Sequence, residues 1–210
     1  MIKILIADDH AIIRRGLTQI VSGEPDMEVV GEAENAQETL DFCRREHCDV
    51  VVLDINMPGR SGLDVLKEVR QECPKLPVLV LSVHPEDQYG VRVLKAGAAG
   101  YLTKESAPEQ LVHAIRRVYR GGKYVSESLA EKLVYELGND GDQPPHAALS
   151  DREYEVMLMI ASGKTVGEIA NVLSLSVKTI STYRSRILIK MNRKNNAELT
   201  YYVIQNRLLG

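Results

Sequence analysis

The chain has 210 residues, of which 44% are hydrophobic and 26% charged, and a formal net charge of -3. This hydrophobic content is enough for a packed core and excludes a chain that is disordered throughout, and the length suits one large domain or two small ones. The first apolar run, in MIKILIADDH, is too short for a secretion signal, and no later run approaches the ~18 residues of a membrane helix. We therefore expect a cytoplasmic protein with no membrane partner.

The charge is distributed unevenly. Residues 149–210 contain nine Lys or Arg and five Asp or Glu, whereas residues 1–148 contain 17 and 24. An acidic first part and a basic last part indicate two modules, of which the second could face a polyanion. The three cysteines, Cys43, Cys48 and Cys73, show no metal-ligand spacing and fit a reducing compartment.

Apolar runs and helical periodicity alternate through the first 120 residues. The expected strands are 3–7, 28–33, 50–54, 77–82 and 98–102. The expected helices are 11–22, 35–47, 62–72, 86–96 and 107–120. Five such repeats with short connections predict a doubly wound α/β domain, in which helices cover both faces of a parallel sheet. In this architecture the functional crevice lies beyond the carboxyl ends of the strands.

A linker is predicted after this domain. The amphipathic stretch SESLAEKLVYEL predicts a helix capped by Ser126, and GNDGDQPPHA at 138–147 breaks both helix and strand. We therefore expect three parts: a first domain over 1–122, a linker with a helix over 123–148, and a small domain over 149–210.

The last module is predicted to be all helix. SDRE at 150–153 and TVGE at 165–168 each fit a capping box, and Gly163 ends the first of the two helices. A tight polar turn at 174–176 then leads into a longer basic helix that reaches about Met191, and a last helix is expected from about 197 to 208. A short helix, a tight turn and a longer basic helix indicate a helix-turn-helix.

Three carboxylates are predicted to meet at one edge of the sheet. Asp8 and Asp9 follow the first strand, and Asp54 ends the third, VVVLD. In a sheet of order 2-1-3-4-5 these strands are neighbours, so the acids repel one another unless a cation joins them. Oxygen ligands favour Mg²⁺. The alternative is that Asp8 or Asp9 caps the following helix and Asp54 is a turn residue.

Ser82 and Lys104 are expected at the same edge, because they end the fourth strand and follow the fifth. Individually, Ser82 could be a turn residue and Lys104 a solvated charge. Together with the three acids they describe a site for Mg²⁺ and for a phosphoryl group on Asp54, where the metal and the ammonium group neutralise oxygen charge.

These residues, with Met57, Pro58 and Gly59, resemble the receiver domain of two-component response regulators. The last module, with LSDREYEVMLMIASGKTVGEIANVLSLSVKTISTYRSRI, looks like the LuxR/GerE-type helix-turn-helix. The resemblance covers the whole chain and points to the NarL/FixJ subfamily. It implies a phosphorylation-switched transcription regulator whose Asp54 accepts phosphate from a phosphohistidine on a sensor histidine kinase.

The resemblance also implies roles for single residues. Asp9, Asp54 and the backbone carbonyl of Asn56 would hold Mg²⁺ (or Mn²⁺), with Asp8 assisting through water. Ser82 and Tyr101 would form a switch pair, although a half-buried strand aromatic is an alternative for Tyr101.

The chain departs from the family's pattern in places. Ser82 replaces the commoner Thr, and Glu105 stands where many receivers have Pro, which puts the family's cis peptide there in doubt. Asn56 and His84 occupy positions that tune dephosphorylation in the family. We do not expect an enzyme, beyond phosphotransfer to the chain's own Asp54 and slow autodephosphorylation.

A helical wheel of the longer basic helix places Val177, Ile180, Ile187, Leu188 and Met191 on one side. On the other side, Ser181, Thr182 and Ser185 are predicted to face base edges in the major groove. The residues predicted to hold DNA phosphates are Lys178, Thr179, Arg184, Arg186 and Lys190. Tyr183 could donate to a phosphate or simply pack. The alternative for the whole helix is an amphipathic helix with a solvated face.

The last helix carries Leu199, Tyr202, Val203 and Leu208. In the family this helix would pair with its twin, giving a homodimer on double-stranded promoter DNA when phosphorylated or DNA-bound. A simple core face is the alternative.

Three other functions remain open. An aspartyl-phosphate enzyme would want a second acid after the nucleophile, and Asp54-Ile55-Asn56 lacks one. A receiver whose output is protein binding has no obvious need of a basic helical module. A DNA binder that does not depend on phosphorylation would leave the complete acid pocket without a role.

Overall fold

The computed structural model describes residues 1–57, 60–138 and 144–209 and divides into two compact units, Met1–Leu133 and Val134–Gly210. Pro58 and Gly59, two of the residues that resemble the receiver domain, and residues 139–143 of the predicted linker lie outside the described residues. Within the described part of the chain, no helix combines the length and the apolar character needed to cross a membrane.

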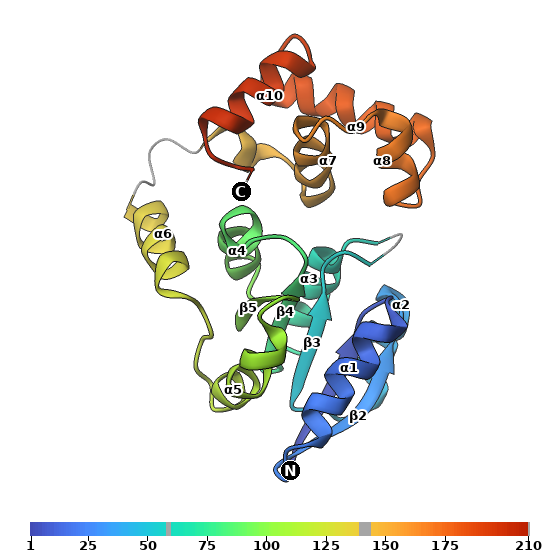
Figure 1. Ribbon diagram of the computed structural model, residues 1–210, viewed down its shortest axis with the longest axis vertical. Helices are drawn as coiled ribbons and strands as arrows, with labels where there is room; N and C mark the ends of the chain where they lie inside the picture. The colour runs from blue at the N-terminus through green and yellow to red at the C-terminus, as the bar shows by residue number, and fades with distance from the viewer. Residues whose placement is uncertain (58–59, 139–143, 210) are drawn as a thin grey trace. The chain divides into compact units, whose positions relative to one another are not determined.

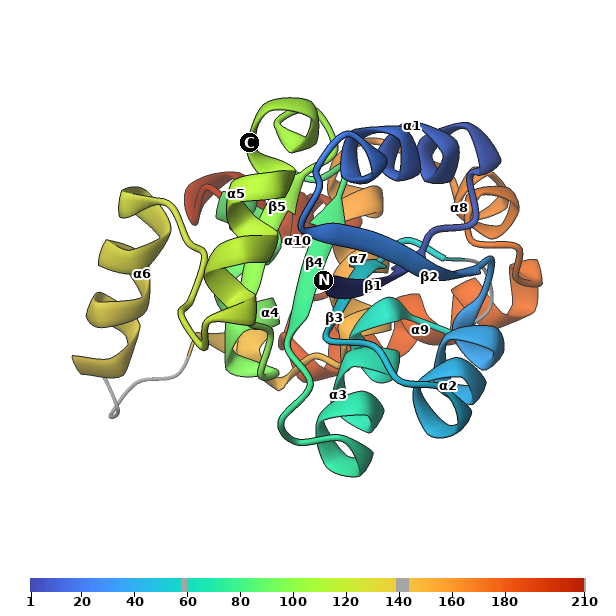
Figure 2. The same ribbon diagram turned by 90° about the horizontal axis from the view of Figure 1, so that it is seen from below.

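The first unit holds a five-stranded parallel sheet of order β2-β1-β3-β4-β5, as predicted (Figure 1). Its strands are β1 (Ile2–Ala7), β2 (Met27–Ala33), β3 (Val50–Asp54), β4 (Val78–Ser82) and β5 (Gly100–Thr103). Its helices are α1 (Ala11–Ser22), α2 (Ala36–Arg45), α3 (Gly62–Glu72), α4 (Glu86–Lys95) and α5 (Ala107–Tyr119). The next helix, α6 (Glu127–Gly138), contains the division between the two units after Leu133. Helices α1 and α5 cover one face of the sheet, and α2, α3 and α4 cover the other (Figure 2).

Strand β3 shows why the sequence has an unbroken apolar run. All five of its residues are at most 1% exposed, because the strand lies in the middle of the sheet with helices on both faces. It pairs with β1 on one side, where Ala7 lies opposite Leu53, and with β4 on the other, where Asp54 lies opposite Leu81. The end of β3 is therefore fixed from both sides, and Asp54 with it.

Helix α3 starts directly against this fixed strand end. The Gly62 N–H donates to Ile55 O over 3.2 Å, and a Cβ on Gly62 would lie 2.4 Å from Asp54 O and 2.5 Å from Ile55 Cα. Because backbone atoms cannot move aside cheaply, we expect Gly62→Ala to lower the free energy of unfolding by about 2 kcal/mol in urea titrations. Gly16→Ala in α1 is the control, since nothing lies within 4 Å of its Cβ and stability should hold or rise.

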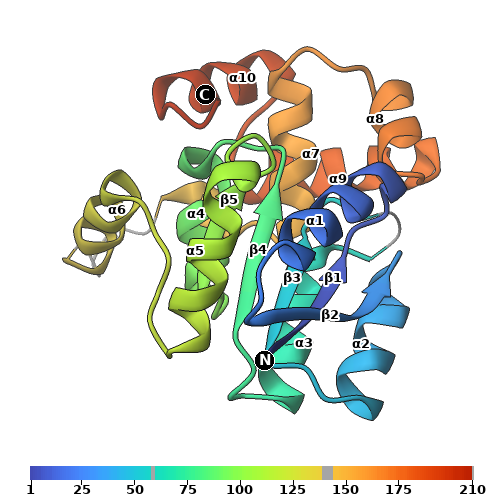
Figure 3. The ribbon, with the colours of Figure 1, turned by 60° about the horizontal axis from the view of Figure 1, so that its bottom comes forward.

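The segment after α5 belongs to the first unit (Figure 3). The Tyr124 N–H donates to Ala99 O over 2.9 Å, and the Tyr101 N–H donates to Tyr124 O over 3.2 Å, so this segment pairs with the outer edge of β5. Ser126 caps α6 as predicted, accepting from the Leu129 N–H over 3.1 Å. The first unit thus extends to Leu133, into the predicted linker, and the domain boundaries at 122 and 148 stay predictions.

The second unit is all helical in its described residues. It contains the 3-10 helix η1 (Pro145–Ala148) and the helices α7 (Asp151–Ala161), α8 (Val166–Val172), α9 (Val177–Lys190) and α10 (Asn196–Gln205). Both predicted capping boxes are present, at Ser150 with Glu153 and at Thr165 with Glu168. The last helix ends earlier than predicted, because the chain turns at Arg207, whose φ of 51° is left-handed.

Candidate functional site

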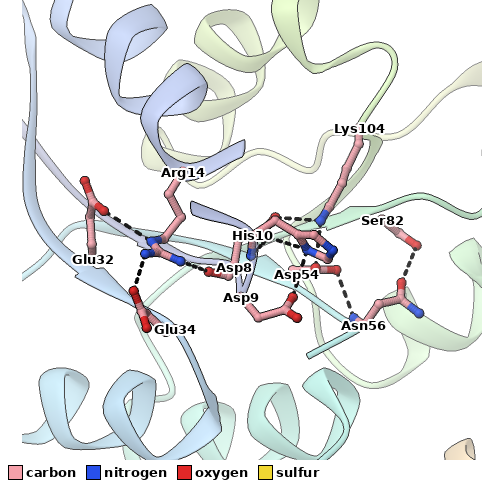
Figure 4. A network of polar contacts seen from close by, with 10 residues as sticks. All are labelled: Asp8, Asp9, His10, Arg14, Glu32, Glu34, Asp54, Asn56, Ser82 and Lys104. Atoms are coloured by element: carbon pink, nitrogen blue, oxygen red, sulfur yellow. Dashed lines mark hydrogen bonds and ion pairs between the residues drawn. The ribbon is translucent and has the colours of Figure 1, made fainter. Parts of the chain in front are cut away.

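The carboxylates of Asp8 and Asp54 lie side by side at the carboxyl edge of the sheet (Figure 4). Asp54 ends β3 and is 0% exposed, and Asp8 follows β1 and is 1% exposed. The Asp8 N–H donates to Ala33 O of β2 over 3.0 Å, which extends the pairing of β1 by one residue beyond the strand. Two buried acids so close together require a positive charge.

Lys104 supplies that charge. Its Nζ lies 2.7 Å from Asp54 Oδ2 and 2.6 Å from Asp8 Oδ2, and its backbone N–H donates to Ser82 O over 2.7 Å, which holds the lysine at this edge. Burial lowers the pKa of the Lys104 ammonium, but both carboxylates more than offset this and raise it above its ordinary value. Burial raises the pKa of Asp54, although Lys104 opposes the change. The predicted convergence of Asp8, Asp54 and Lys104 is thus present.

Ser82 and Asn56 lie at the same edge as Asp54 (Figure 4). Ser82 Oγ donates to Asn56 Oδ1 over 3.3 Å, and the Asn56 N–H donates to Asp54 Oδ1 over 2.9 Å. Asn56 Nδ2 lies 3.1 Å from His84 Nε2. Burial lowers the pKa of His84, which favours the neutral imidazole that can accept this bond. The two positions expected to tune dephosphorylation therefore contact each other.

Tyr101 points into the protein. Its ring is 3% exposed, and its Oη donates to His84 O over 2.8 Å. Burial also raises the pKa of the phenol, so the hydroxyl stays protonated and can donate. The ring is thus fully buried and not half-buried, and the role of Tyr101 in a switch pair stays a prediction.

The donor set fits a hard divalent cation. One ligand atom each of Asp8, Asp9, His10 and Asp54 lies within 4.8 Å of the others. Asp8 Oδ2 and Asp9 Oδ1 are buried, and each faces a nitrogen, Lys104 Nζ at 2.6 Å and His10 Nδ1 at 3.0 Å. Carboxylate oxygens of this kind are the ligands that a hard divalent cation prefers. His10 was missed by the sequence analysis. Its Nδ1 lies 3.1 Å from Asp8 Oδ1 and 3.0 Å from Asp9 Oδ1, and its place directly after two acids was the available signal.

The predicted DNA-reading face of α9 is open to solvent. Lys178, Ser181, Thr182, Ser185 and Arg186 are all exposed. The hydroxyls of Thr182 and Ser185 donate back to the carbonyls of Lys178 and Ser181, over 3.0 and 3.1 Å. Each of these hydroxyls keeps free capacity to accept a hydrogen bond.

The other residues of α9 that are predicted to contact DNA are half-buried or already paired. Thr179, Tyr183 and Arg184 are half-buried, and Arg184 Nε donates to Asn196 Oδ1 over 2.6 Å. Lys190 Nζ donates to Glu153 Oε2 over 2.6 Å, so a phosphate would have to compete with this ion pair.

One residue of the helical wheel is misplaced. Val177, expected on the apolar side, is 56% exposed, because it is the first residue of α9 and precedes the buried Ile180 and Ile187. In α10, Leu199, Tyr202 and Val203 are at most 6% exposed and belong to the core of the unit. The core alternative therefore holds for these residues, and pairing with a twin would need other side chains.

Both units match known families. The first matches the response regulator receiver domain over residues 4–116, and the second matches the bacterial regulatory proteins of the luxR family over residues 147–203. The chain belongs to the response regulators. It is a DNA-binding transcription regulator controlled by phosphorylation, and its family consists of transcription regulators rather than enzymes.

Curated response regulators match along nearly their whole length. The chain is 37% identical to the response regulator UvrY of Escherichia coli strain K12, with 99% of this chain and 96% of UvrY covered. It is 37% identical to the response regulator GacA of Pseudomonas protegens, with 100% and 98% covered.

A solved response regulator has a similar structure. RcsB from Salmonella enterica serovar Typhimurium, bound to a promoter in the presence of a phosphomimetic, matches with a TM-score of 0.63 and 27% identity, over 96% of this chain and 97% of RcsB. Response regulators take their signals from histidine kinases and bind promoter DNA, and receiver domains generally use Mg²⁺.

Proposed function

We propose that Asp54 of this response regulator is the phosphoacceptor, taking its phosphoryl group from the phosphohistidine of a sensor histidine kinase. The observation that carries the proposal is the geometry around Asp54, a fully buried carboxylate at a fixed strand end with Lys104 Nζ at 2.7 Å. A surface aspartate would not need a buried ammonium group beside it.

The residues around Asp54 would have different roles in phosphoryl transfer. An Asp54 oxygen forms the new bond to phosphorus while the bond from phosphorus to the kinase imidazole breaks. The Asn56 N–H and Lys104 hold the two carboxylate oxygens in place, and Lys104 neutralises charge on the transferred group. Asp9, Asp54 and the Asn56 carbonyl would hold Mg²⁺, or Mn²⁺, with Asp8 assisting through water. When bound, the ion supplies further charge neutralisation to the phosphoryl oxygens.

The switch pair, Ser82 and Tyr101, would respond to the phosphoryl group on Asp54. The Ser82 hydroxyl turns from Asn56 toward the phosphoryl group, and the Tyr101 ring occupies the inward position. The buried ring supports this assignment, as does the bond from Tyr101 Oη to His84 O, which joins β5 to the loop that follows Ser82. The added charge of about -1.5 to -2 would then favour one of two receiver states. Asn56 and His84 would govern slow autodephosphorylation.

The output would be promoter binding in the cytoplasm by a homodimer, formed on phosphorylation or on DNA. Helix α9 would lie in the major groove, with Ser181, Thr182 and Ser185 at base edges. The predicted phosphate contacts are Lys178, Thr179, Tyr183, Arg184, Arg186 and Lys190. The exposed polar face of α9 supports this, as does the structure of two RcsB dimers bound to two parallel DNAs, which matches with a TM-score of 0.59 and 28% identity.

Acetyl phosphate with Mg²⁺ tests the proposal on the full chain. We expect intact mass to show one added phosphoryl group. At raised salt, we then expect the phosphorylated sample to retain fewer sequences from a randomised duplex library than the untreated chain retains, with each retained sequence more strongly enriched. Phosphorylation without any change in DNA retention would contradict the coupling between the two modules. Turnover of a small phosphate ester would support an enzyme instead.

A further inference from the structure

The arginine in the first turn of α1 is buried beside the acid pocket. Its side chain is only 7% exposed, which is unusual for a residue that almost always stays charged. Arg14 makes three contacts: Nη1 donates to Asp8 O over 2.7 Å, Nε donates to Glu32 Oε2 over 3.2 Å, and Nη2 donates to Glu34 Oε1 (Figure 4). One guanidinium group thus joins α1, the end of β2 and the backbone of the pocket.

The bond to the Asp8 carbonyl matters most for the site. This oxygen belongs to the planar peptide group between Asp8 and Asp9, so holding it fixes the direction in which the chain continues to Asp9. On its other side Asp8 is held by its N–H, which donates to Ala33 O over 3.0 Å. The two bonds together fix the backbone that carries two neighbouring carboxylates.

Charge and backbone positioning predict opposite effects of Arg14 on the metal site. Two carboxylates, Glu32 and Glu34, already face the single positive charge of Arg14. Removing Arg14 would leave those carboxylates unpaired and make the edge more negative, which by charge alone would strengthen cation binding. Loss of backbone positioning would weaken it. The two accounts therefore predict changes of opposite sign.

We propose that Arg14 is a positioning residue for the metal site, setting the Asp8–Asp9 backbone so that Asp9 can bind the divalent cation directly and Asp8 can assist through water. The inference rests on the proposed function, because it takes Asp8, Asp9 and Asp54 as the residues that surround the ion. Lysine cannot replace arginine at this position, since a single ammonium group cannot reach the carbonyl and both carboxylates in the geometry of the fork.

The test uses Mn²⁺ as the probe and the full chain as Arg14→Met, Arg14→Lys and wild type. Bound Mn²⁺ is counted by electron paramagnetic resonance, and phosphorylation by acetyl phosphate is followed against Mg²⁺ concentration. We expect both variants to bind Mn²⁺ about tenfold more weakly than wild type, the range known for removing a partner behind a metal ligand. The Mg²⁺ needed for half-maximal phosphorylation should rise by the same factor, while the rate at saturating Mg²⁺ stays near that of wild type.

Arg116→Met is the matched control. Arg116 also holds two carboxylates, Asp26 over 2.6 and 2.9 Å and Glu24 over 2.6 Å, but at the opposite end of β2. The Arg116→Met variant loses the same charge from a similar network, and its Mn²⁺ affinity should equal that of wild type. Arg14→Lys keeps the charge, so it carries the test if Arg14→Met does not fold.

Three results would count against the proposal. Unchanged or tighter Mn²⁺ binding by Arg14→Lys would overturn the positioning role and leave the metal site standing. A loss of affinity in Arg116→Met as large as that in the Arg14 variants would show a general structural effect. Equal Mn²⁺ affinity of wild type and Asp9→Asn would overturn the proposed site itself.

Discussion

Asp54→Asn is expected to abolish phosphorylation by acetyl phosphate completely, so that intact mass shows no added phosphoryl group under conditions that modify wild type. The substitution keeps the shape of a side chain that is 0% exposed, but an amide has no carboxylate oxygen to attack phosphorus. Phosphorylation-dependent DNA binding should disappear in the same sample, because the switch has lost its input.

Asp64→Asn is the matched control for this experiment. Asp64 lies ten residues further along, in the first turn of α3, where it is exposed. It should be phosphorylated like wild type. A phosphoryl group found on Asp54→Asn at the wild-type level would place the acceptor elsewhere and remove the role we give to the buried pocket.

Lys178→Ala combined with Arg186→Ala is expected to weaken binding to duplex DNA about 100-fold at moderate salt. Both side chains are exposed on the open face of α9, and each lost charge-assisted contact to a phosphate costs roughly tenfold or more. Each phosphate contact also releases counterions, so the slope of log affinity against log salt should become less steep by about 0.9 for each contact that the variant loses. Fluorescence anisotropy over a salt series measures both quantities.

Lys194→Ala combined with Arg207→Ala provides the comparison, since it removes two exposed positive charges that lie outside α9. Its affinity and salt slope should stay close to those of wild type. Equal losses in the two double variants would mean that net charge, and not the face of α9, governs DNA binding.

Much of this molecule could be predicted because its signals are local. The apolar run of β3 is buried on both faces, so its boundaries were read correctly to the residue. The same holds for α3, where Ser61 accepts from the Leu63 N–H and caps the helix. Once strand order was predicted, the rule that parallel strands share a carboxyl edge brought Asp8, Asp54 and Lys104 together without knowledge of any side-chain contact.

Features that depend on tertiary contacts escaped prediction. Arg14 reads as an ordinary helical arginine, because Glu32 and Glu34 come close to it only when β2 lies beside β1. The exposure of Val177 depends on where α9 starts relative to the core, which a helical wheel does not contain. The ion pair of Lys190 with Glu153 likewise needs α9 to lie against α7.

The pairing of Tyr124 with β5 bears on how such proteins exchange their output modules during evolution. If the chain were recombined directly after Gly122, the Ala99 carbonyl and the Tyr101 N–H would lose their partners and β5 would become an open edge, a template for aggregation. Recombination after Leu133 would carry the protecting segment along. The part of the chain that has to stay together is therefore longer than the sheet and its five helices. A different output module has to be joined beyond the first turns of α6.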